Sequence, residues 1–214
     1  MKEDLASIRH EYSKQNLNKS SVKANPLEQF ELWFEEANKS AALEVNAMNL
    51  ATVNEQGLPS SRIVLLKGMT KTGFVFYTNY QSKKGKEMES NPGVALNFFW
   101  PELERQVRIQ GTVEKISKEE SEEYFQSRPK NSQIGAWASP QSAVITNREI
   151  LERREKELQE RYKDDKVLPK PEQWGGYEVK PFAIEFWQGR NSRLHDRILY
   201  TVKGDKWEIN RLAP

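Results

Sequence analysis

The chain has no cysteine and only two histidines, His10 and His195. The absence of cysteine excludes disulfide bonds, thiolate metal ligands and a cysteine nucleophile. A zinc site combines several histidines, cysteines or carboxylates, and His195 has no second histidine nearby in the sequence. We therefore expect no metal centre.

Long apolar runs are also missing. No stretch approaches the roughly 18 consecutive apolar residues that cross a membrane. The segment from Met1 to Ser7 is too charged for a secretory signal. We therefore expect no membrane partner and a cytoplasmic protein.

Neither sign of charge dominates, because Lys and Arg total 33 while Asp and Glu total 31. A chain with so small a net charge has no overall electrostatic field that would attract nucleic acid. We therefore expect no nucleic-acid partner and only a local anion site. The common phosphate-binding motifs are absent as well: no G-x-G-x-x-G segment follows a predicted strand, and there is neither a Walker-type loop nor a nucleophile elbow. A phosphorylated ligand would therefore have to be held by cationic side chains.

The hydrophobic pattern predicts a mixed, mainly β chain with helices (α+β). A helix begins at Asn25-Pro26, where a capping residue precedes proline. Strands are expected over residues 48–53, 62–67, 74–78, 94–100, 106–116, 177–188, 194–202 and 206–212, and further helices from Ser82, from Ser117 to Pro129 and, as a solvated charge-rich face, over 146–163. Short connections favour antiparallel pairing in a barrel or sandwich. We expect residues 1–24 to form a mobile arm and residues 25–214 to form a single domain.

The segment from Arg193 to Arg197 indicates an anion site. On an extended strand Arg193, His195 and Arg197 would project from one face, where like charges repel. The apolar strand from Ile184 to Gly189 would place these cations at the mouth of a buried sheet. A bound phosphate, carboxylate or reduced flavin would stabilise them, and a solvated basic strand is the alternative.

A second group of cations lies in the first half of the chain. Arg62 and Lys67 flank the apolar run from Ile63 to Leu66, which should be buried and should carry the flanking charges toward a specific partner. Because they are five residues apart, the two cations point to opposite faces of a regular strand; a two-fold interface or a twist at the strand end could unite them. Lys83 and Lys84 stand in the first turn of a helix, either as anion ligands or as an exposed basic turn.

A third group surrounds Pro129. Tyr124 and Arg128 lie four residues apart on one helical face and Ser132 follows the proline, so a phenol, a guanidinium and a hydroxyl could converge on one phosphate. Two separate phosphate sites suggest two phosphorylated ligands. Residues 132–142 add hydroxyls and amides that suit a heterocycle, although by composition this segment could equally be a capped helix and a loop.

Several long motifs, in order, closely resemble the pyridoxine (pyridoxamine) 5′-phosphate oxidase family. They are Arg62 to Lys67 (R-I-V-L-L-K), Phe76 to Asn79, Leu103 to Val107, Ser127 to Pro129 with Ser132 to Trp137, Glu185 to Gly189, and Arg193 to Arg197 with the ending Arg211 to Pro214. The resemblance covers roughly residues 26–214. It implies an FMN-binding, antiparallel split β-barrel with peripheral helices that works as a homodimer. It also implies a role in vitamin B6 metabolism, the oxidation of pyridoxine or pyridoxamine 5′-phosphate to pyridoxal 5′-phosphate with O2 as acceptor and release of hydrogen peroxide.

The resemblance also assigns site residues. Its FMN contacts fall on Arg62, Ile63, Val64, Leu65, Leu66, Lys67, Tyr77, Thr78, Lys83, Lys84, Gln106, Gln141, Ser142, Trp187 and Arg197. Its substrate contacts fall on Lys67, Tyr124, Arg128, Ser132, Arg193 and His195, and Arg9 and Tyr12 resemble part of a segment that closes over the substrate. The family commonly has arginine at position 83; lysine keeps the charge but loses the bidentate geometry.

The implied reaction moves a hydride, or its equivalent, from C4′ of the substrate to N5 of the flavin, so positioning is the main task. We expect Arg193 and His195 to be catalytic. Arginine stays protonated in proteins, so Arg193 would orient and stabilise charge, whereas His195 can titrate. Two alternatives stand beside this interpretation: a related split-barrel flavin oxidase that acts on a phenazine precursor, and a non-catalytic flavin- or pyridoxal-phosphate-binding protein. The phosphate cluster argues against the first, and the pairing of Arg193 with His195 argues against the second.

Overall fold

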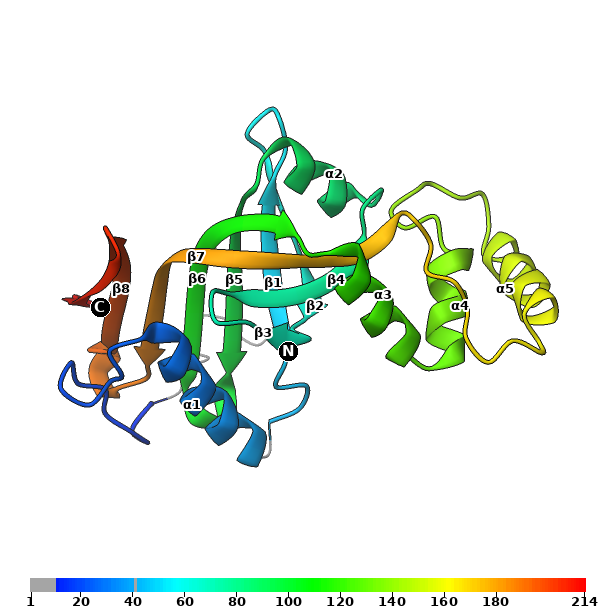
Figure 1. The fold of residues 1–214 in the computed structure, drawn as a ribbon. Coiled ribbons are helices and arrows are strands. Elements are labelled where there is room, and N and C mark those ends of the chain that lie inside the picture. Colours follow the sequence, from blue (N-terminus) through cyan, green and yellow to red (C-terminus); the bar gives the residue numbers. More distant parts are fainter. Residues whose placement is uncertain (1–10, 41) are drawn as a thin grey trace, which may run out of the picture. The chain divides into compact units, whose positions relative to one another are not determined.

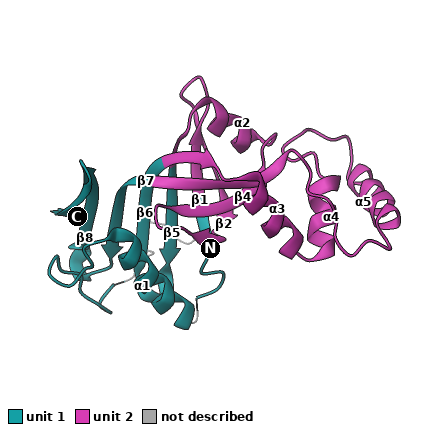
Figure 2. Ribbon diagram, viewed as in Figure 1, with its two compact units in different colours: residues 1–49, 95–111, 181–214 teal, residues 50–94, 112–180 magenta. Residues whose placement is uncertain are grey.

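The computed structural model describes residues 11–40 and 42–214, and the chain divides into two compact units (Figure 2). Unit 1 comprises residues 1–49, 95–111 and 181–214, and unit 2 comprises residues 50–94 and 112–180. Among the described residues, no helix is long and apolar enough to cross a membrane.

Helices and antiparallel strands alternate along the described chain (Figure 1). The helices are α1 (Pro26–Lys39), α2 (Lys83–Ser90), α3 (Lys118–Ser127), α4 (Lys130–Ala138) and α5 (Glu149–Arg161). The strands are β1 (Ala47–Val53), β2 (Pro59–Leu65), β3 (Gly68–Met69), β4 (Phe74–Asn79), β5 (Gly93–Trp100), β6 (Arg105–Lys115), β7 (Trp174–Gln188), β8 (Asp196–Lys203) and β9 (Lys206–Leu212). They form one sheet in the order β2-β1-β5-β6-β7-β4-β3, with β8 also paired to β7 and β9 paired to β8. The pairs β3–β4, β4–β7, β7–β8 and β8–β9 are antiparallel, which confirms the predicted mainly β, antiparallel class.

Helix α1 forms in unit 1 because its start is capped and one face is aromatic. The Asn25 side chain accepts a hydrogen bond from the backbone N–H of Leu27 at 2.9 Å, and Pro26 occupies the first turn. Phe30 and Trp33 are buried, and the Trp33 ring meets Phe186 edge to face at 5.1 Å. The predicted helix and its core-facing side are therefore confirmed.

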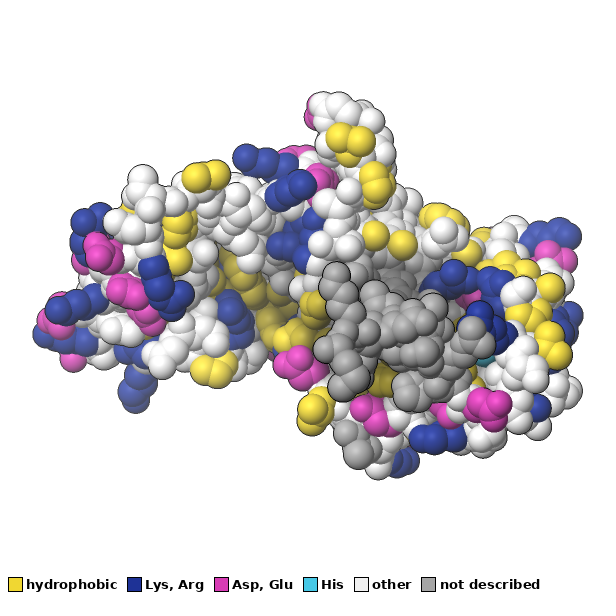
Figure 3. Space-filling model, turned by 180° about the vertical axis from the view of Figure 1, so that it is seen from behind, with side chains coloured by type: hydrophobic (Ala, Val, Ile, Leu, Met, Phe, Trp, Pro, Cys, Tyr) yellow, Lys and Arg dark blue, Asp and Glu magenta, His cyan; other side chains and the backbone are white. Residues whose placement is uncertain are grey.

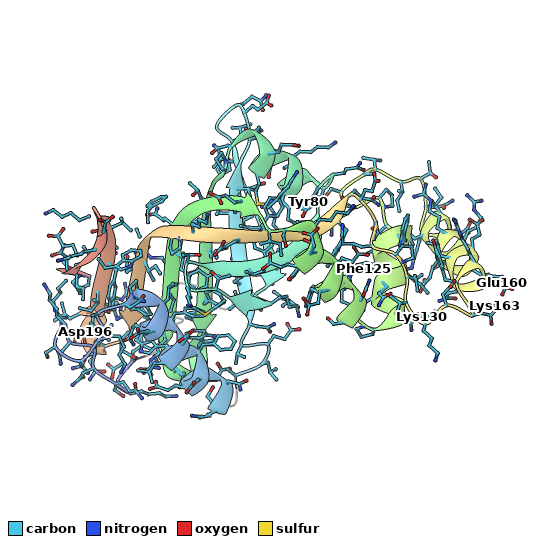
Figure 4. All side chains as sticks on the ribbon, in the orientation of Figure 1. Tyr80, Phe125, Lys130, Glu160, Lys163 and Asp196 are labelled. Carbon is cyan, nitrogen blue, oxygen red and sulfur yellow. The ribbon has the colours of Figure 1, made fainter. Side chains whose placement is uncertain are left out.

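The chain before α1 is fastened to the C-terminal hairpin of unit 1. Leu17 is buried, and its backbone N–H donates to the Asp196 carboxylate at 3.1 Å. Its carbonyl oxygen accepts from the Arg211 guanidinium at 2.9 Å, and Arg211 in turn donates to Asp196 at 2.6 Å. Figure 4 labels Asp196 in this part of the molecule. A single carboxylate-guanidinium pair thus binds both backbone groups of Leu17.

The helices of unit 2 have strong start signals. The Ser82 hydroxyl accepts from the N–H of Gly85, and Ser117 forms a capping box with Glu120. The segment after Pro129, for which a capped helix and a loop was the alternative to a ligand-binding segment, contains helix α4. Lys130, labelled in Figure 4, donates to the backbone oxygens of Lys163 at 3.0 Å and Asp165 at 2.9 Å, which ties α4 to the chain that follows α5.

A small apolar cluster of unit 2 supports these helices. Its buried members are Phe125, Ile134, Leu168 and Trp174, and Tyr77, Tyr124, Trp137, Leu158 and Tyr162 pack against it. No residue of α5 is buried, so the prediction of a solvated, charge-rich helix is confirmed.

The prediction that Arg193, His195 and Arg197 share one strand face is wrong. Strand β8 begins only at Asp196. Ser192 and Arg193 have left-handed backbones, with φ of 54° and 61°, so they form a tight turn rather than an extended strand. The alternation of side chains that the prediction relied on therefore does not apply before Asp196.

The expected burial of the run from Ile63 to Leu66 is also mostly wrong. Ile63 is 64% exposed and Leu65 is 37% exposed, and only Leu66 is buried. Strand β2 lies at the end of the sheet order, and its side chains alternate between exposed and half-buried positions. An apolar strand can thus be left open where the sheet has no further neighbour on one side.

Candidate functional site

A cavity of about 500 Å³ in unit 2 contains most of the predicted ligand residues of that unit. Its volume falls within the range of ordinary ligand pockets. The predicted residues that line it are Arg62, Ile63, Val64, Leu65, Lys67, Tyr77, Thr78, Lys84, Tyr124, Arg128, Ser132 and Gln141. In Figure 3 the surface is hollowed where hydrophobic side chains lie next to Lys and Arg side chains, the combination that lines this cavity. The two groups of cations and hydroxyls that the sequence separated therefore share one cavity.

Lys84 gives this cavity a buried positive charge. It is only 8% exposed, and its ammonium donates to the Thr78 hydroxyl at 3.3 Å and to the Gln141 side-chain oxygen at 3.2 Å. Both acceptors are neutral. Burial, and to a lesser extent the charge of Arg62, lower the pKa of the Lys84 ammonium. A buried cation with neutral partners favours an anion in the cavity.

Arg62 reaches the same cavity with its guanidinium anchored to the protein. One terminal nitrogen donates to the Thr52 hydroxyl at 2.5 Å and to the Leu50 carbonyl at 3.2 Å. The other donates to Ser60 at 2.6 Å and to the Glu87 carboxylate at 3.3 Å. These contacts fix the orientation of Arg62 and offset much of its charge.

Lys83 lies outside the 500 Å³ cavity. Its exposed ammonium is 3.8 Å from a Glu87 oxygen, and it borders a second cavity of about 660 Å³ together with Gln141 and Ser142. Ser142 is exposed and has a left-handed backbone with φ of 71°. The two lysines of the helix start are thus divided between two cavities.

Lys67 and Arg62 line one cavity although they are five residues apart. Strand β2 ends at Leu65, and the N–H of Lys67 donates to the carbonyl of Val75 at 2.8 Å. The regular alternation of the strand therefore stops before Lys67. Of the two alternatives that the spacing left open, the end of the strand suffices to explain how both side chains reach the cavity.

Arg128 contributes an unpaired hydrogen-bond donor to the group that it forms with Tyr124 and Ser132. Its Nη1 atom is buried without a hydrogen-bond partner. The guanidinium carbon lies 4.7 Å from the Trp174 ring centre and 5.6 Å from that of Phe125. Burial lowers the pKa of Arg128, while nearby Tyr124 opposes this effect. A buried N–H group of this kind is costly unless an acceptor reaches it.

Two phenols line the same cavity as Arg128. The rings of Tyr77 and Tyr124 stack with centroids 3.8 Å apart and planes 16° apart. Burial and then the neighbouring Tyr124 raise the pKa of Tyr77 to about 12, and burial raises the pKa of Tyr124. Both hydroxyls therefore remain protonated at neutral pH and can donate to an anion.

A second cluster of predicted residues belongs to unit 1. The Trp187 and His195 rings have centroids 4.6 Å apart, and Tyr12 packs at 5.9 Å from each. The Nδ1 atom of His195 accepts a hydrogen bond from the backbone N–H of Arg190 at 3.1 Å, so in the neutral ring the proton is on Nε2. Burial and then the charge of Arg193 lower the pKa of the His195 imidazole. Arg193 itself is exposed.

Three further predicted residues have different surroundings. Arg197 donates to both oxygens of Glu185, at 2.8 and 3.1 Å, and to the carbonyl of Ala213 at 2.7 Å, so its guanidinium is largely occupied by the protein. Gln106 is half-buried on β6. Arg9 lies outside the described residues.

The sequence interpretation did not identify Glu87 or Trp174. Glu87 lies on a lysine-rich helix, and Trp174 is the first residue of β7, directly before Gly175 and Gly176. An aromatic residue directly before two glycines was the one available signal for Trp174, because such glycines permit another chain segment to approach closely.

Known proteins resemble this chain over its whole length. The sequence model of the pyridoxamine 5′-phosphate oxidase family matches residues 34–162, and that of the pyridoxine 5′-phosphate oxidase C-terminal dimerisation region matches residues 174–214. A pyridoxine/pyridoxamine 5′-phosphate oxidase of Cytophaga hutchinsonii is 54% identical over 215 residues, covering 100% of both chains. One of Burkholderia mallei is 55% identical over 213 residues, covering 98% of this chain and 99% of that protein.

Solved structures share the fold. PhzG from Burkholderia lata, solved with tetrahydrophenazine-1-carboxylic acid, has a TM-score of 0.89 at 27% identity and covers 94% of this chain and 100% of its own. A pyridoxamine 5′-phosphate oxidase-related, FMN-binding protein from Nostoc punctiforme has a TM-score of 0.71 at 18% identity, covering 89% of this chain and 98% of its own. The predicted split-barrel fold is therefore confirmed, and the chain belongs to the pyridoxamine 5′-phosphate oxidase family.

Proposed function

We propose that this protein is an FMN-dependent oxidase that converts pyridoxine and pyridoxamine 5′-phosphate to pyridoxal 5′-phosphate, with O2 as acceptor and release of hydrogen peroxide. The observation that carries the proposal is one cavity that contains two cationic groups without an anionic partner. One is the buried Lys84 ammonium with neutral partners, and the other is the unpaired, buried Nη1 of Arg128. The names of the full-length relatives support the same reaction.

The first of these groups, the Lys84 ammonium, fits the phosphate of FMN. Lys84 would pair with the phosphate, and Arg62, whose guanidinium Glu87 holds in place, would add N–H donors. Thr78 and Gln141, which now bind the ammonium, offer a hydroxyl and an amide for the rest of the ligand. Bound FMN would supply the two-electron acceptor and the reactivity with O2, chemistry that no side chain here provides.

The second group, the Arg128 guanidinium, fits the phosphate of the substrate. Arg128 would donate its free Nη1, and Lys67, Tyr124 and Ser132 line the same cavity with an ammonium and two hydroxyls. Such contacts bind the ground state and the transition state alike, because the phosphate is remote from the bond that changes. This cluster would therefore set substrate affinity and hold the substrate ring in place.

We assign the reacting end of the substrate to His195 and Arg193. With Nδ1 occupied by the Arg190 N–H, the neutral His195 ring presents an Nε2–H donor rather than a basic nitrogen. Arg193 adds a permanent charge that orients and stabilises, and Tyr12 packs on His195 as part of the segment that would close over the site. FMN contacts at Gln106, Trp187 and Arg197 are part of the same proposal.

The working form would be a homodimer. The C-terminal match carries the name of a dimerisation region and spans residues 174–214. An interface over this region would cover Phe182, which is 50% exposed in the single chain, and burial of an apolar side chain favours association. Sedimentation should give twice the chain mass of 24.9 kDa.

The second candidate is an oxidase of the PhzG type, favoured by the TM-score of 0.89 with that structure. The purified protein distinguishes the candidates. We expect flavin bands in its visible spectrum, or reconstitution by FMN, and peroxide release with pyridoxine 5′-phosphate but far less with pyridoxine. Turnover of tetrahydrophenazine-1-carboxylic acid, the compound bound in the PhzG structure, in place of the phosphorylated substrates would favour the PhzG type. Flavin binding without peroxide from either substrate would indicate a binding protein.

A further inference from the structure

Trp174 anchors a column of stacked rings in unit 2. Its ring is 5.4 Å from Tyr77 and 6.2 Å from Tyr124, with interplanar angles of 10° and 6°. The Arg128 guanidinium lies over the same indole at 4.7 Å. Phe125, labelled on α3 in Figure 4, is 5.6 Å from that guanidinium. The Trp174 indole thus stacks with the phenol rings of Tyr77 and Tyr124, and it also lies under the guanidinium of Arg128.

A pair of glycines allows this column to form. Tyr77 on β4 pairs with Gly176 on β7, and a Cβ atom at Gly176 would lie 2.8 Å from the Tyr77 ring. A Cβ atom at Gly175 would collide with the Tyr80 hydroxyl. The strand can therefore lie flat against Tyr77 only because both residues lack a side chain. That approach places Trp174, the first residue of β7, beside Tyr77.

Stacking on an aromatic ring has a chemical advantage for an arginine that binds a ligand. Arg62 is oriented by a carboxylate, Glu87, which also neutralises it. None of the hydrogen bonds and ion pairs of the described residues joins Arg128 to a carboxylate. An aromatic face fixes the plane of a guanidinium through cation–π attraction while leaving its N–H groups free.

We propose that Trp174 is a positioning residue for Arg128, and that it keeps the guanidinium aimed at the substrate phosphate without competing for its hydrogen bonds. This inference rests on the proposed function, in which Arg128 binds that phosphate. The cavity would then contain two cations that are oriented in different ways. A carboxylate orients Arg62, and an indole orients Arg128.

The test is steady-state kinetics on pyridoxine 5′-phosphate for Trp174→Leu, Trp174→Phe and the matched control Trp137→Leu. Trp137 packs against the same apolar cluster and donates to the Pro169 carbonyl at 2.9 Å, but it does not line the cavity. Trp174→Leu should raise KM about tenfold or more, the factor that corresponds to about 1.4 kcal/mol. Its kcat and FMN content should stay within about twofold of the parent. Trp174→Phe keeps an aromatic face and should recover most of the affinity.

A double-mutant cycle shows whether the effect passes through Arg128. In an Arg128→Ala background, Trp174→Leu should raise KM no further. An equal further rise there, or an effect of Trp137→Leu as large as that of Trp174→Leu, would overturn the inference. Calorimetric binding of pyridoxal 5′-phosphate by the same variants keeps this inference separate from the reaction. If the parent binds it without turning over pyridoxine phosphate and Trp174→Leu weakens binding tenfold, the proposed function fails and the inference stands.

Discussion

The buried Glu87 and the half-buried Arg62 form an ion pair, with 3.3 Å between the Oε2 and Nη2 atoms. The same carboxylate oxygen accepts hydrogen bonds from Thr52 at 2.6 Å and from Ser60 at 2.8 Å. These contacts join β2 and α2 to Thr52 in the part of β1 that belongs to unit 2, and Arg62 itself lines the cavity. Glu87 therefore links the stability of unit 2 to the orientation of a proposed FMN ligand.

Glu87→Gln should lower the free energy of unfolding at neutral pH by about 1.5 to 3 kcal/mol, the range for hydrogen bonds to charged groups. Burial alone would raise the pKa of Glu87, but the hydrogen bonds from Thr52 and Ser60 and the charges of Arg62 and Lys83 lower it overall. Since the folded pKa lies below the ordinary 4.5, this stabilisation is present above 4.5 and is lost as pH falls through the folded value. Urea unfolding of parent and variant across this pH range should show the difference shrink below about pH 4. A difference that does not change with pH would contradict the ionised state of Glu87.

Lys84→Met should weaken FMN binding by about 10- to 100-fold, because one charge-assisted contact with the phosphate is lost. Lys83→Met is the matched control from the adjacent position, where the exposed ammonium borders the other cavity and pairs with Glu87. Its effect should be about threefold or less. Flavin fluorescence titration of the apoprotein measures both. Equal losses in the two variants would remove the distinction between a buried ligand and an exposed charge.

His195→Ala should keep the flavin spectrum and lose kcat/KM by about 100-fold. In the parent, kcat/KM should fall as acid protonates His195, because Nδ1 can then no longer accept from the Arg190 N–H. Burial and the charge of Arg193 place this pKa below the ordinary 6.5, so Arg193→Gln should move the acid limb upward. The pH profiles of kcat/KM for the two proteins check the shift. An acid limb that stays in place would show that another group titrates.

Asp196→Asn should loosen the chain around Leu17. The variant loses the charge that binds Arg211, and hydrogen exchange of the Leu17 amide should accelerate about tenfold or more. Glu208→Gln is the control, since Glu208 pairs only at 3.7 Å with Lys203 on an exposed part of the same hairpin. KM should rise as well if the segment that carries Tyr12 closes over the substrate. Unchanged exchange at Leu17 would mean that the Arg211 contact alone suffices.

The sequence predicted the elements well where the signals are local. The cap at Asn25 and the capping box at Ser117 begin helices at the expected positions. It failed at Ser192 and Arg193, because a left-handed turn in two non-glycine residues leaves no pattern in the composition. It also failed at Ile63, since an apolar strand at the end of a sheet has the same sequence as a buried one.

The candidate site was predicted in its residues but not in its arrangement. Charge and spacing pointed to Lys84 and Arg128 separately. Their meeting in one cavity depends on long-range strand pairing, which no local pattern encodes. Trp174 was missed for the same reason: its partner Tyr77 is far away in the sequence and is brought close by β4–β7 pairing.

If Lys84 binds the phosphate of FMN as proposed, its buried ammonium also makes the thermal stability of this protein depend on the supply of FMN. A desolvated charge with neutral partners costs free energy in the empty protein, and a bound phosphate removes that cost. Because the unfolded chain has no such pocket, each tenfold rise in free FMN above its dissociation constant should add about 1.4 kcal/mol to the free energy of unfolding. The melting temperature then reports cofactor loading. In a cell short of flavin, the empty chains would be not only inactive but also the first to unfold and be degraded.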